Sequence, residues 1–227
     1  MCFTVITFDL HSLRNMSHQH WDKVYSTKQP NEVSWTQKIP RTSLDFIHSA
    51  NLDKGASIID IGGGDSNLVD FLLDEGYENI TVLDISEQGI NRAKQRLGSR
   101  AAKVNWIVSD ITAFSPTTSY DFWHDRAAFH FLTSRPEIEK YVSTARQAVK
   151  PGGALVLGTF SDEGPKKCSG LDISQYCEIT LTKALQDGFE KIRCFTEDHT
   201  TPFNTTQNFL FCLFRRTAIN RNSPEIN

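Results

Sequence analysis

Apolar and polar positions alternate along the middle of the chain in a way that predicts strands and helices in turn. Short apolar runs are typical of buried strands, and the segments between them carry apolar side chains at helical spacing. The predicted strands are residues 57–61, 80–83, 104–108, 120–123 and 154–160. The predicted helices between them are residues 66–75, 86–97 and 136–149. This alternation indicates a parallel sheet covered by helices on both faces.

The two ends of the chain follow a different pattern. Residues 21–25 and 42–48 are predicted helices that precede the first strand, and a helix near residues 175–185 follows the fifth strand. Two further strands, residues 189–196 and 207–215, then follow one another closely. They are predicted to form an antiparallel pair at the edge of the sheet.

Composition restricts the class of protein. The chain has 227 residues, of which 39% are hydrophobic, and a formal charge of −3, so it resembles a globular protein without a basic surface for nucleic acid. No apolar stretch approaches the ~20 residues that span a bilayer. The five cysteines are scattered and form no metal-binding pattern, so we expect reduced thiols, no metal site and a cytoplasmic location. Oligomeric state is not readable from the sequence.

A glycine-rich turn after the first strand is the strongest chemical signal. Gly62, Gly63 and Gly64 separate that strand from the next helix, where the absence of a Cβ lets the backbone approach a ligand. Asp84 ends the second strand, and an acid at that place can accept both ribose hydroxyls of an adenosine moiety. The alternative is a tight turn used for packing only.

Two features of this turn favour S-adenosylmethionine over a dinucleotide. Asn67 stands where a dinucleotide-binding turn needs its third glycine. Asp60 and Asp65 flank the glycines, and carboxylates repel a pyrophosphate but tolerate a cationic methionine group. A P-loop is excluded, because no Lys-Ser/Thr pair follows the glycines.

Asp110 and Ile111 follow the third predicted strand. The carboxylate is suitably placed to bind the adenine amino group, and Ile111 to cover the ring. The alternative is that Asp110 caps a short helical turn.

Taken together, these motifs resemble the class I, seven-stranded S-adenosylmethionine-dependent methyltransferases. The resemblance covers residues 58–160, including the Lys150–Gly153 turn, and extends from His20 onward to a bacterial-type subgroup of small methyltransferases without an assigned acceptor. It implies a doubly wound, Rossmann-like mixed sheet of order 3-2-1-4-5-7-6, with the last strand antiparallel. The turn departs from the family pattern at Ser66, which replaces the last glycine.

The sequence also predicts a division of the chain, in which only the lid follows from the resemblance. Residues 1–16 are expected to be a disordered extension, since Met16 offers an alternative start, and residues 17–216 to form a single domain. Within that domain residues 17–40 would form a lid over the site, and residues 217–227 would be a tail.

Residue roles follow from the same resemblance. Asp60 and the glycines would line the methionine part of the cofactor, Asp84 the ribose, and Asp110 with Ile111 the adenine. The complete set of expected cofactor-binding residues is Asp60, Gly62, Gly63, Gly64, Asp84, Ile85, Asp110, Ile111, His124, Asp125, Trp21, Tyr25 and Trp35. Trp21, Tyr25 and Trp35 would form an aromatic wall around the sulfonium, or simply pack the N-terminal helix on the domain.

Methyl transfer requires a base only when the acceptor must lose a proton. His124, His130 and His199 are candidates because histidine titrates near neutrality, although each could be structural. Arg126 could bind an acidic acceptor through two hydrogen bonds, or pair with Asp125.

The expected function is in-line transfer of a methyl group from S-adenosylmethionine, which leaves S-adenosylhomocysteine, to a small-molecule acceptor. Protein lysine methylation is the nearest alternative. Two others are an NAD(P)-dependent oxidoreductase, which lacks its third glycine and a Tyr-x-x-x-Lys pair here, and a binding protein that has lost catalysis. No sequence feature names the acceptor.

Overall fold

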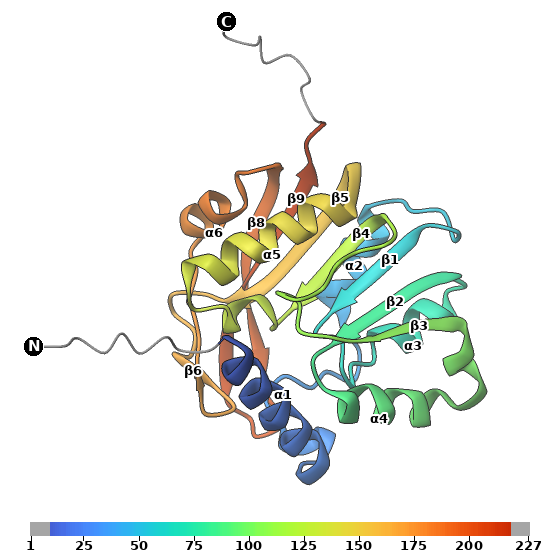
Figure 1. The fold of residues 1–227 in the computed structure, drawn as a ribbon, viewed down its shortest axis with the longest axis vertical. Coiled ribbons are helices and arrows are strands. Elements are labelled where there is room, and N and C mark those ends of the chain that lie inside the picture. The colour runs from blue at the N-terminus through green and yellow to red at the C-terminus, as the bar shows by residue number, and fades with distance from the viewer. Residues whose placement is uncertain (1–9, 219–227) are drawn as a thin grey trace, which may run out of the picture.

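A single seven-stranded sheet organises the chain in the computed structural model, which describes residues 10–218 (Figure 1). The strand order is β3-β2-β1-β4-β5-β9-β8, which confirms the predicted order. Two short strands, β6 and β7, follow β5 along the chain and pair only with each other, so the last two strands of the sheet are numbered β8 and β9. β1 to β5 pair in parallel, whereas β9 runs antiparallel to both β5 and β8. The predicted fold class is therefore confirmed.

The element bounds follow the sequence pattern except in α1 and at the start of β5. The main strands are β1 (Ser57–Ile61), β2 (Asn79–Asp84), β3 (Val104–Val108), β4 (Tyr120–Arg126), β5 (Val149–Phe160), β8 (Phe189–Thr200) and β9 (Thr206–Arg216). The α-helices are α1 (Leu10–Thr27), α2 (Arg41–Ser49), α3 (Leu68–Asp74), α4 (Glu87–Leu97), α5 (Arg135–Ala148) and α6 (Glu178–Leu185). Short 3-10 turns η1 (Pro30–Glu32), η2 (Gly98–Lys103) and η3 (Phe129–Phe131) and the hairpin β6 (Lys167–Cys168) and β7 (Leu171–Asp172) complete the list.

Helices cover both faces of the sheet because its central strands are apolar on both sides. One core contains Trp123, Leu155 and Leu210 with side chains of α5 and α6. The other contains Phe122, Val156 and Phe209 with side chains of α2 and α3. Figure 1 shows α5 in front of the sheet and α2 behind it, with α1 beside α4 at the end where the parallel strands finish.

The structure departs from the sequence predictions at the N-terminus. Helix α1 begins at Leu10, so residues 10–16 of the predicted extension are helical, while residues 1–9 lie outside the described part. At the other end residues 217–218 form no regular element, and the rest of the predicted tail is also outside the described part.

Two further departures lie in the C-terminal half. β5 begins before the Lys150–Gly153 turn, which forms an irregularity within the strand opposite Tyr120 and Phe122. Cys194 and Cys212 form a disulfide, so the prediction of reduced thiols is wrong for this pair. The two cysteines are 18 positions apart in sequence, and only the antiparallel register of β8 and β9 places them opposite each other.

Within residues 10–218 no helix has the length and apolar character needed to cross a membrane.

Candidate functional site

The glycine turn is held tightly against the second strand. The backbone N–H of Gly62 donates to the carbonyl of Leu83 at 2.7 Å, which fixes the end of β1 beside the end of β2. Gly62 and Gly64 have φ angles of 66° and 40°, which side-chain-bearing residues rarely adopt. A Cβ on Gly63 would lie 2.7 Å from both Asp60 Oδ2 and Val82 Cγ1. The three glycines are therefore required by close packing around the turn.

Ser66 has a clear structural role in place of the expected glycine. Its hydroxyl accepts a hydrogen bond from the backbone N–H of Leu68 at 3.1 Å, where α3 begins. Its own N–H donates to the carbonyl of Gly63 at 2.7 Å. The side chain therefore satisfies a backbone donor that has no partner inside the helix.

Asp84 lies against the glycine turn as the sequence predicts. A Cβ on Gly64 would be 2.9 Å from Asp84 Oδ2, and the N–H of Ser86 donates to Oδ1 at 2.7 Å. Burial raises the pKa of Asp84 to about 7, and the nearby carboxylate of Asp60 contributes to this shift. A buried acid with few neutralising partners is suited to accept hydrogen bonds from a ligand.

Tyr25 of α1 lies over this position. Its ring would contact a Cβ on Gly89 at 3.0 Å, and its hydroxyl would lie 2.5 Å from a Cβ on Gly64. Burial, followed by the charge of Asp84, raises the pKa of the Tyr25 hydroxyl well above its usual value. The helix that carries Tyr25 is joined to α4, because Asp22 accepts hydrogen bonds from the Ser86 hydroxyl at 2.7 Å and from the Gln88 N–H at 3.2 Å. The predicted lid helix is thus attached beside the expected ribose position.

Asp60, His124 and Ser43 form a buried hydrogen-bonded chain. Asp60 and His124 are register partners on β1 and β4, and Asp60 Oδ1 lies 2.7 Å from His124 Nδ1. His124 Nε2 lies 2.8 Å from Ser43 Oγ in α2. Both ring nitrogens of His124 are occupied, so its role in this structure is to hold these elements together. Ser43 carries no motif of its own and was missed by the sequence analysis.

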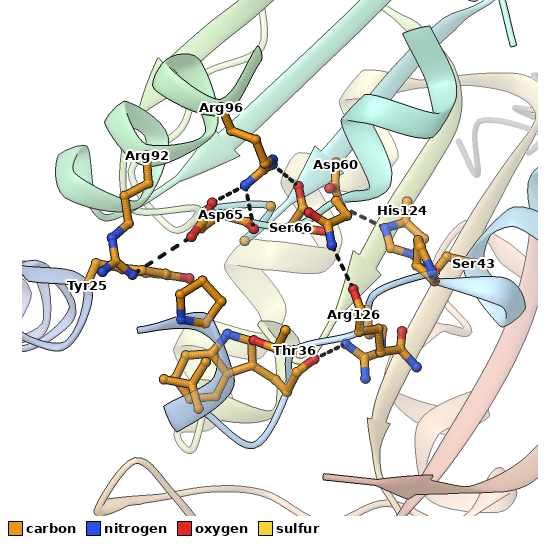
Figure 2. A pocket seen from close by; sticks show the side chains of 18 residues that line it. Tyr25, Thr36, Ser43, Asp60, Asp65, Ser66, Arg92, Arg96, His124 and Arg126 are labelled. Carbon is orange, nitrogen blue, oxygen red and sulfur yellow. Dashed lines mark hydrogen bonds and ion pairs between the residues drawn. The ribbon is translucent and has the colours of Figure 1, made fainter. Parts of the chain in front are cut away.

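Asp65 is paired with arginine side chains of α4. Its carboxylate pairs with Arg96 and lies 3.8 Å from Arg92, both on α4 (Figure 2). Burial still raises the pKa of Asp65 above its ordinary value despite these guanidinium groups. Because Asp60 and Asp65 are both engaged, they do not present the unpaired negative charge that would repel a pyrophosphate. The preference for S-adenosylmethionine then depends on the glycine pattern and on the family.

A pocket opens between the glycine turn and the segment that follows α1 (Figure 2). Residues from three parts of the chain line it: Tyr25, Pro30, Val33, Trp35, Thr36, Gln37, Pro40 and Ser43 before β1; Asp60, Gly62, Gly63, Asp65, Ser66 and Asn67 around the turn; and Arg92, Arg96, His124 and Arg126 beyond it. The Asn67 side chain donates to the carbonyl of Gln37 at 3.0 Å, which connects the covering segment to the turn. Arg92 and Arg96 lie against Asp65, and Asn67 bonds to Gln37. These partners are distant in sequence, so the sequence pattern could not predict them.

The aromatic residues expected around the site do converge. The ring centroids of Trp21 and Trp35 are 5.6 Å apart, and those of Tyr25 and Trp35 are 6.5 Å apart. The ring centroids of Trp21 and Phe131 are 5.0 Å apart. Trp21 does not line the pocket.

Asp125 points away from the pocket, contrary to the expectation for it. Neighbouring residues on a strand face opposite sides, so His124 and Asp125 cannot both reach the same site. Asp125 accepts hydrogen bonds from the Tyr141 hydroxyl at 2.8 Å and from the N–H groups of Ala128 and Phe129 at 3.1 Å. Burial raises its pKa to about 6 in spite of these donors. The residue stabilises the turn after β4, and it does not pair with Arg126.

The adenine-binding candidates lie outside the pocket as it is formed here. Asp110 Oδ1 accepts from both the N–H and the hydroxyl of Thr112 at 2.7 Å, which is the capping alternative considered above. The N–H of Ser109 donates to the carbonyl of Asp84 at 2.9 Å, so the end of β3 lies beside the end of β2. Ile85 and Ile111 are both half-buried.

The other two histidines differ from His124. Burial lowers the pKa of His130 to about 3, so its imidazole is neutral at physiological pH. The Nε2 of His199 donates to the carbonyl of Ser34 at 2.7 Å, and burial, followed by the charge of Arg126, lowers the pKa of this histidine. In the neutral form of His199 the proton is therefore on Nε2, and Nδ1 carries the lone pair that can accept a proton.

Comparison with known proteins identifies the central part of the chain. Residues 58–153 match the family model of the methyltransferase domain. This segment is similar to methyltransferase domains. The glycine turn, Asp84, Asp110 and the β4 end all fall within it, which agrees with the class I resemblance.

Curated relatives of the methyltransferase domain include two kinds of enzyme. Malonyl-[acyl-carrier protein] O-methyltransferase 2 of Ilyobacter polytropus is 29% identical over 108 residues, which cover 47% of this chain and 40% of that protein. EEF1A lysine methyltransferase 2 of Danio rerio is 22% identical over 156 residues, covering 61% of this chain and 66% of the relative. The chain thus matches less than half the length of the first of these relatives.

Among solved structures, the Burkholderia thailandensis 1,6-didemethyltoxoflavin-N1-methyltransferase shares the fold with a TM-score of 0.69 and 15% identity. The likeness covers 95% of this chain and 94% of that one, whose structure contains 1,6-didemethyltoxoflavin and S-adenosylhomocysteine.

Proposed function

We propose that the protein is an S-adenosylmethionine-dependent methyltransferase that acts on a small-molecule acceptor. The observation that carries this proposal is the buried carboxylate of Asp84 at the end of β2, directly against Gly64. In nucleotide-binding α/β folds an acid at this place receives the ribose hydroxyls. The match to the methyltransferase domain supports a methyl donor as the nucleoside bound there.

The residues of the turn fit an adenosyl cofactor. Gly63 and Gly64 leave no room for a Cβ, so the backbone itself forms the floor of the site. We assign Asp60 and the three glycines to the methionine part, Asp84 and Ile85 to the ribose, and Asp110 with Ile111 to the adenine. Tyr25 and Trp35 line the site, Trp21 packs against Trp35, and His124 holds Asp60 in place.

S-adenosylmethionine supplies a methyl group on a sulfonium, which carries its own leaving group. The chain then needs to hold the acceptor nucleophile in line with that methyl group, and positioning alone can supply most of the catalysis. An acceptor that must lose a proton needs a base as well. His199 is the candidate base, because its hydrogen bond through Nε2 to Ser34 leaves Nδ1 of a neutral imidazole to accept a proton.

The covering segment supports a small acceptor. Residues between Pro30 and Pro40 form one wall of the pocket, and a concave site covered by such a segment suits a small molecule better than a protein side chain on a large partner. Protein lysine methylation is the second candidate, favoured by the likeness to the Danio rerio enzyme.

Two measurements test the proposal. Calorimetry with S-adenosylhomocysteine, NAD+ and NADP+ should show binding of the first compound only, and Asp84→Ala should weaken that binding at least tenfold. Cell extract is then divided by size and incubated with methyl-labelled cofactor. Label in the small-molecule fraction supports the proposal, whereas label only in protein favours the second candidate. Binding of a nicotinamide dinucleotide alone would refute methyl transfer. Cofactor binding without labelling of either fraction would indicate a binding protein.

Two further properties stay predictions. A cytoplasmic location is checked by cell fractionation, and independence from nucleic acid by a filter-binding assay at low salt.

A further inference from the structure

Arg126, at the end of β4, has hydrogen-bond donors that no described residue uses. Its Nη1 donates to the carbonyl of Trp35 at 2.9 Å. Its Nε and Nη2 are shielded from water and have no hydrogen-bond partner among residues 10–218. Leaving a buried charged donor unsatisfied is unfavourable, so such atoms indicate a missing ligand.

The charge of Arg126 is also not balanced by an ion pair in the described part of the chain. The acids that act on it most strongly are Glu197 and Asp60, and both have other partners. Glu197 accepts from the Thr42 hydroxyl at 2.5 Å, and Asp60 is bonded to His124. Burial lowers the pKa of Arg126 to about 10, which leaves the guanidinium charged at neutral pH. A buried cation of this kind requires an anion.

The two unused nitrogens are suitably arranged for one class of anion. Nε–H and Nη2–H lie along the same edge of the planar guanidinium and point in parallel. A carboxylate presents two oxygens at matching spacing, and this two-point contact is the strongest that arginine forms.

An aromatic ring of β9 lies close to the guanidinium of Arg126. The guanidinium carbon lies 5.1 Å from the centroid of Phe209. Burial, followed by the charge of Arg126, lowers the pKa of His130, and both ring nitrogens of His130 are buried without hydrogen-bond partners in the described chain. Gln207 precedes Phe209 by two residues on β9, so it faces the same side, and its Oε1 is also buried and unpartnered. Arg126 thus lines the pocket and lies beside Phe209 of β9.

We propose that Arg126 binds a carboxylate through Nε and Nη2, and that this carboxylate belongs to the methyl acceptor. The inference rests on the proposed methyltransferase function. The methionyl end of the cofactor also carries a carboxylate and is the other possible source. The position of Arg126 beside Phe209 of β9 favours the acceptor, because the cofactor is expected over β1, β2 and β3.

The test uses the full-length protein and two pairs of probes. S-adenosylhomocysteine is compared with its decarboxylated form, which differs only in the missing carboxylate. Acetate, benzoate and succinate are compared with acetamide and benzamide, with S-adenosylhomocysteine present at saturation. Binding is measured by calorimetry for the wild type, Arg126→Gln and Arg126→Lys. Arg135→Gln, an exposed arginine on α5, is the matched control. Melting temperatures establish that each variant is folded.

We expect at least one of the carboxylates to bind more tightly than the amides, and Arg126→Gln to weaken that binding by about 10- to 100-fold. Arg126→Lys should restore only part of it, because lysine keeps the charge but not the parallel pair of donors. S-adenosylhomocysteine should bind Arg126→Gln and wild type equally. If instead the variant loses affinity for S-adenosylhomocysteine but not for its decarboxylated form, the carboxylate is that of the cofactor and the assignment to the acceptor is wrong.

If neither pair of probes distinguishes Arg126→Gln from Arg135→Gln, the carboxylate site itself is overturned. Failure of the proposed function has a different result, since the wild type would then bind neither form of the nucleoside. In that case the binding of the carboxylate probes can still be measured by calorimetry on the protein without nucleoside.

Discussion

His124 and Asp60 occupy paired positions on adjacent parallel strands, with 2.7 Å between Nδ1 and Oδ1. The bond joins the end of β4 to the residue that precedes the glycine turn. Because Ser43 occupies the other ring nitrogen, one imidazole connects two strands and helix α2. The relationship makes His124 a positioning residue in this structure.

Replacing His124 by two different amides separates its two bonds. Asparagine places its amide near the position of Nδ1 and keeps the contact to Asp60, whereas glutamine reaches toward Ser43 and leaves Asp60 unpartnered. A buried carboxylate without a donor is more unfavourable than a buried hydroxyl. We expect His124→Gln to lower the free energy of unfolding by about 3 kcal/mol and His124→Asn by about 1 kcal/mol, measured by urea denaturation. Ser43→Ala should resemble His124→Asn, and equal losses in the two amide variants would contradict the assignment.

Asp84 should make the folded protein less stable as the pH rises. Its pKa is about 7 in the folded state, well above that of a free carboxyl. Between about pH 4 and pH 7 the folded state holds a proton that the unfolded state has released, so stability is lost as the pH increases through this range. Asp84→Asn should therefore raise the melting temperature at pH 8 by roughly 2–8 °C, with a smaller difference at pH 5. It should also abolish binding of S-adenosylhomocysteine.

Asp121 is the matched control for that experiment. Burial opposes ionisation of its carboxyl, but hydrogen bonds from Lys150 and the Ser57 N–H outweigh it and lower its pKa. Its contribution to stability is therefore present near neutrality and is lost as the pH falls through the lowered pKa. Asp121→Asn should slightly lower the melting temperature at pH 8, and a rise in both variants would refute the assignment for Asp84.

The glycine turn should tolerate no methyl group at Gly63. A Cβ there would lie 2.7 Å from Asp60 Oδ2 and from Val82 Cγ1, so the turn must shift. We expect Gly63→Ala to weaken S-adenosylhomocysteine binding more than tenfold in calorimetry, since close backbone approach is lost. Gly55→Ala has no neighbour within 4 Å and serves as the control with unchanged affinity. Similar affinities for the two variants would show that the turn does not contact the ligand.

Trp35 should report on ligand binding. It lines the pocket, and its carbonyl accepts a hydrogen bond from Arg126. We expect S-adenosylhomocysteine to change the tryptophan emission of the wild type, and Trp35→Phe to remove more than half of that change. Trp106→Phe, which lies on β3 away from the pocket, should leave the change intact. An equal response in both variants would place the ligand elsewhere.

The pairing of Cys194 with Cys212 has its own test. Peptide mapping without reductant should recover the segments that contain the two cysteines as one linked species, whereas Cys168 should remain a free thiol. The double variant Cys194→Ala with Cys212→Ala should lose about 2 kcal/mol of stability under oxidising conditions. Complete alkylation of both cysteines in the untreated native protein would contradict the pairing.

The amino-acid sequence alone determined the order of elements and the place of Asp84 beside the glycine turn. Apolar runs that alternate with helical segments determine a doubly wound sheet, and a glycine turn after the first strand is a local feature of the chain. Asp84 could be located because parallel strands end at the same edge of a sheet. These are properties of short segments and of topology, so spacing is sufficient to read them.

Tertiary structure decided what each side chain contacts. Asp125 follows His124 directly, but strand alternation turns it to the opposite face, where it meets Tyr141. Ser43, Arg96 and Trp35 are distant in sequence from their partners around the turn, and only packing brings them together. The unused donors of Arg126 became visible for the same reason: whether a charged group is buried and unpaired depends on every element that packs around it.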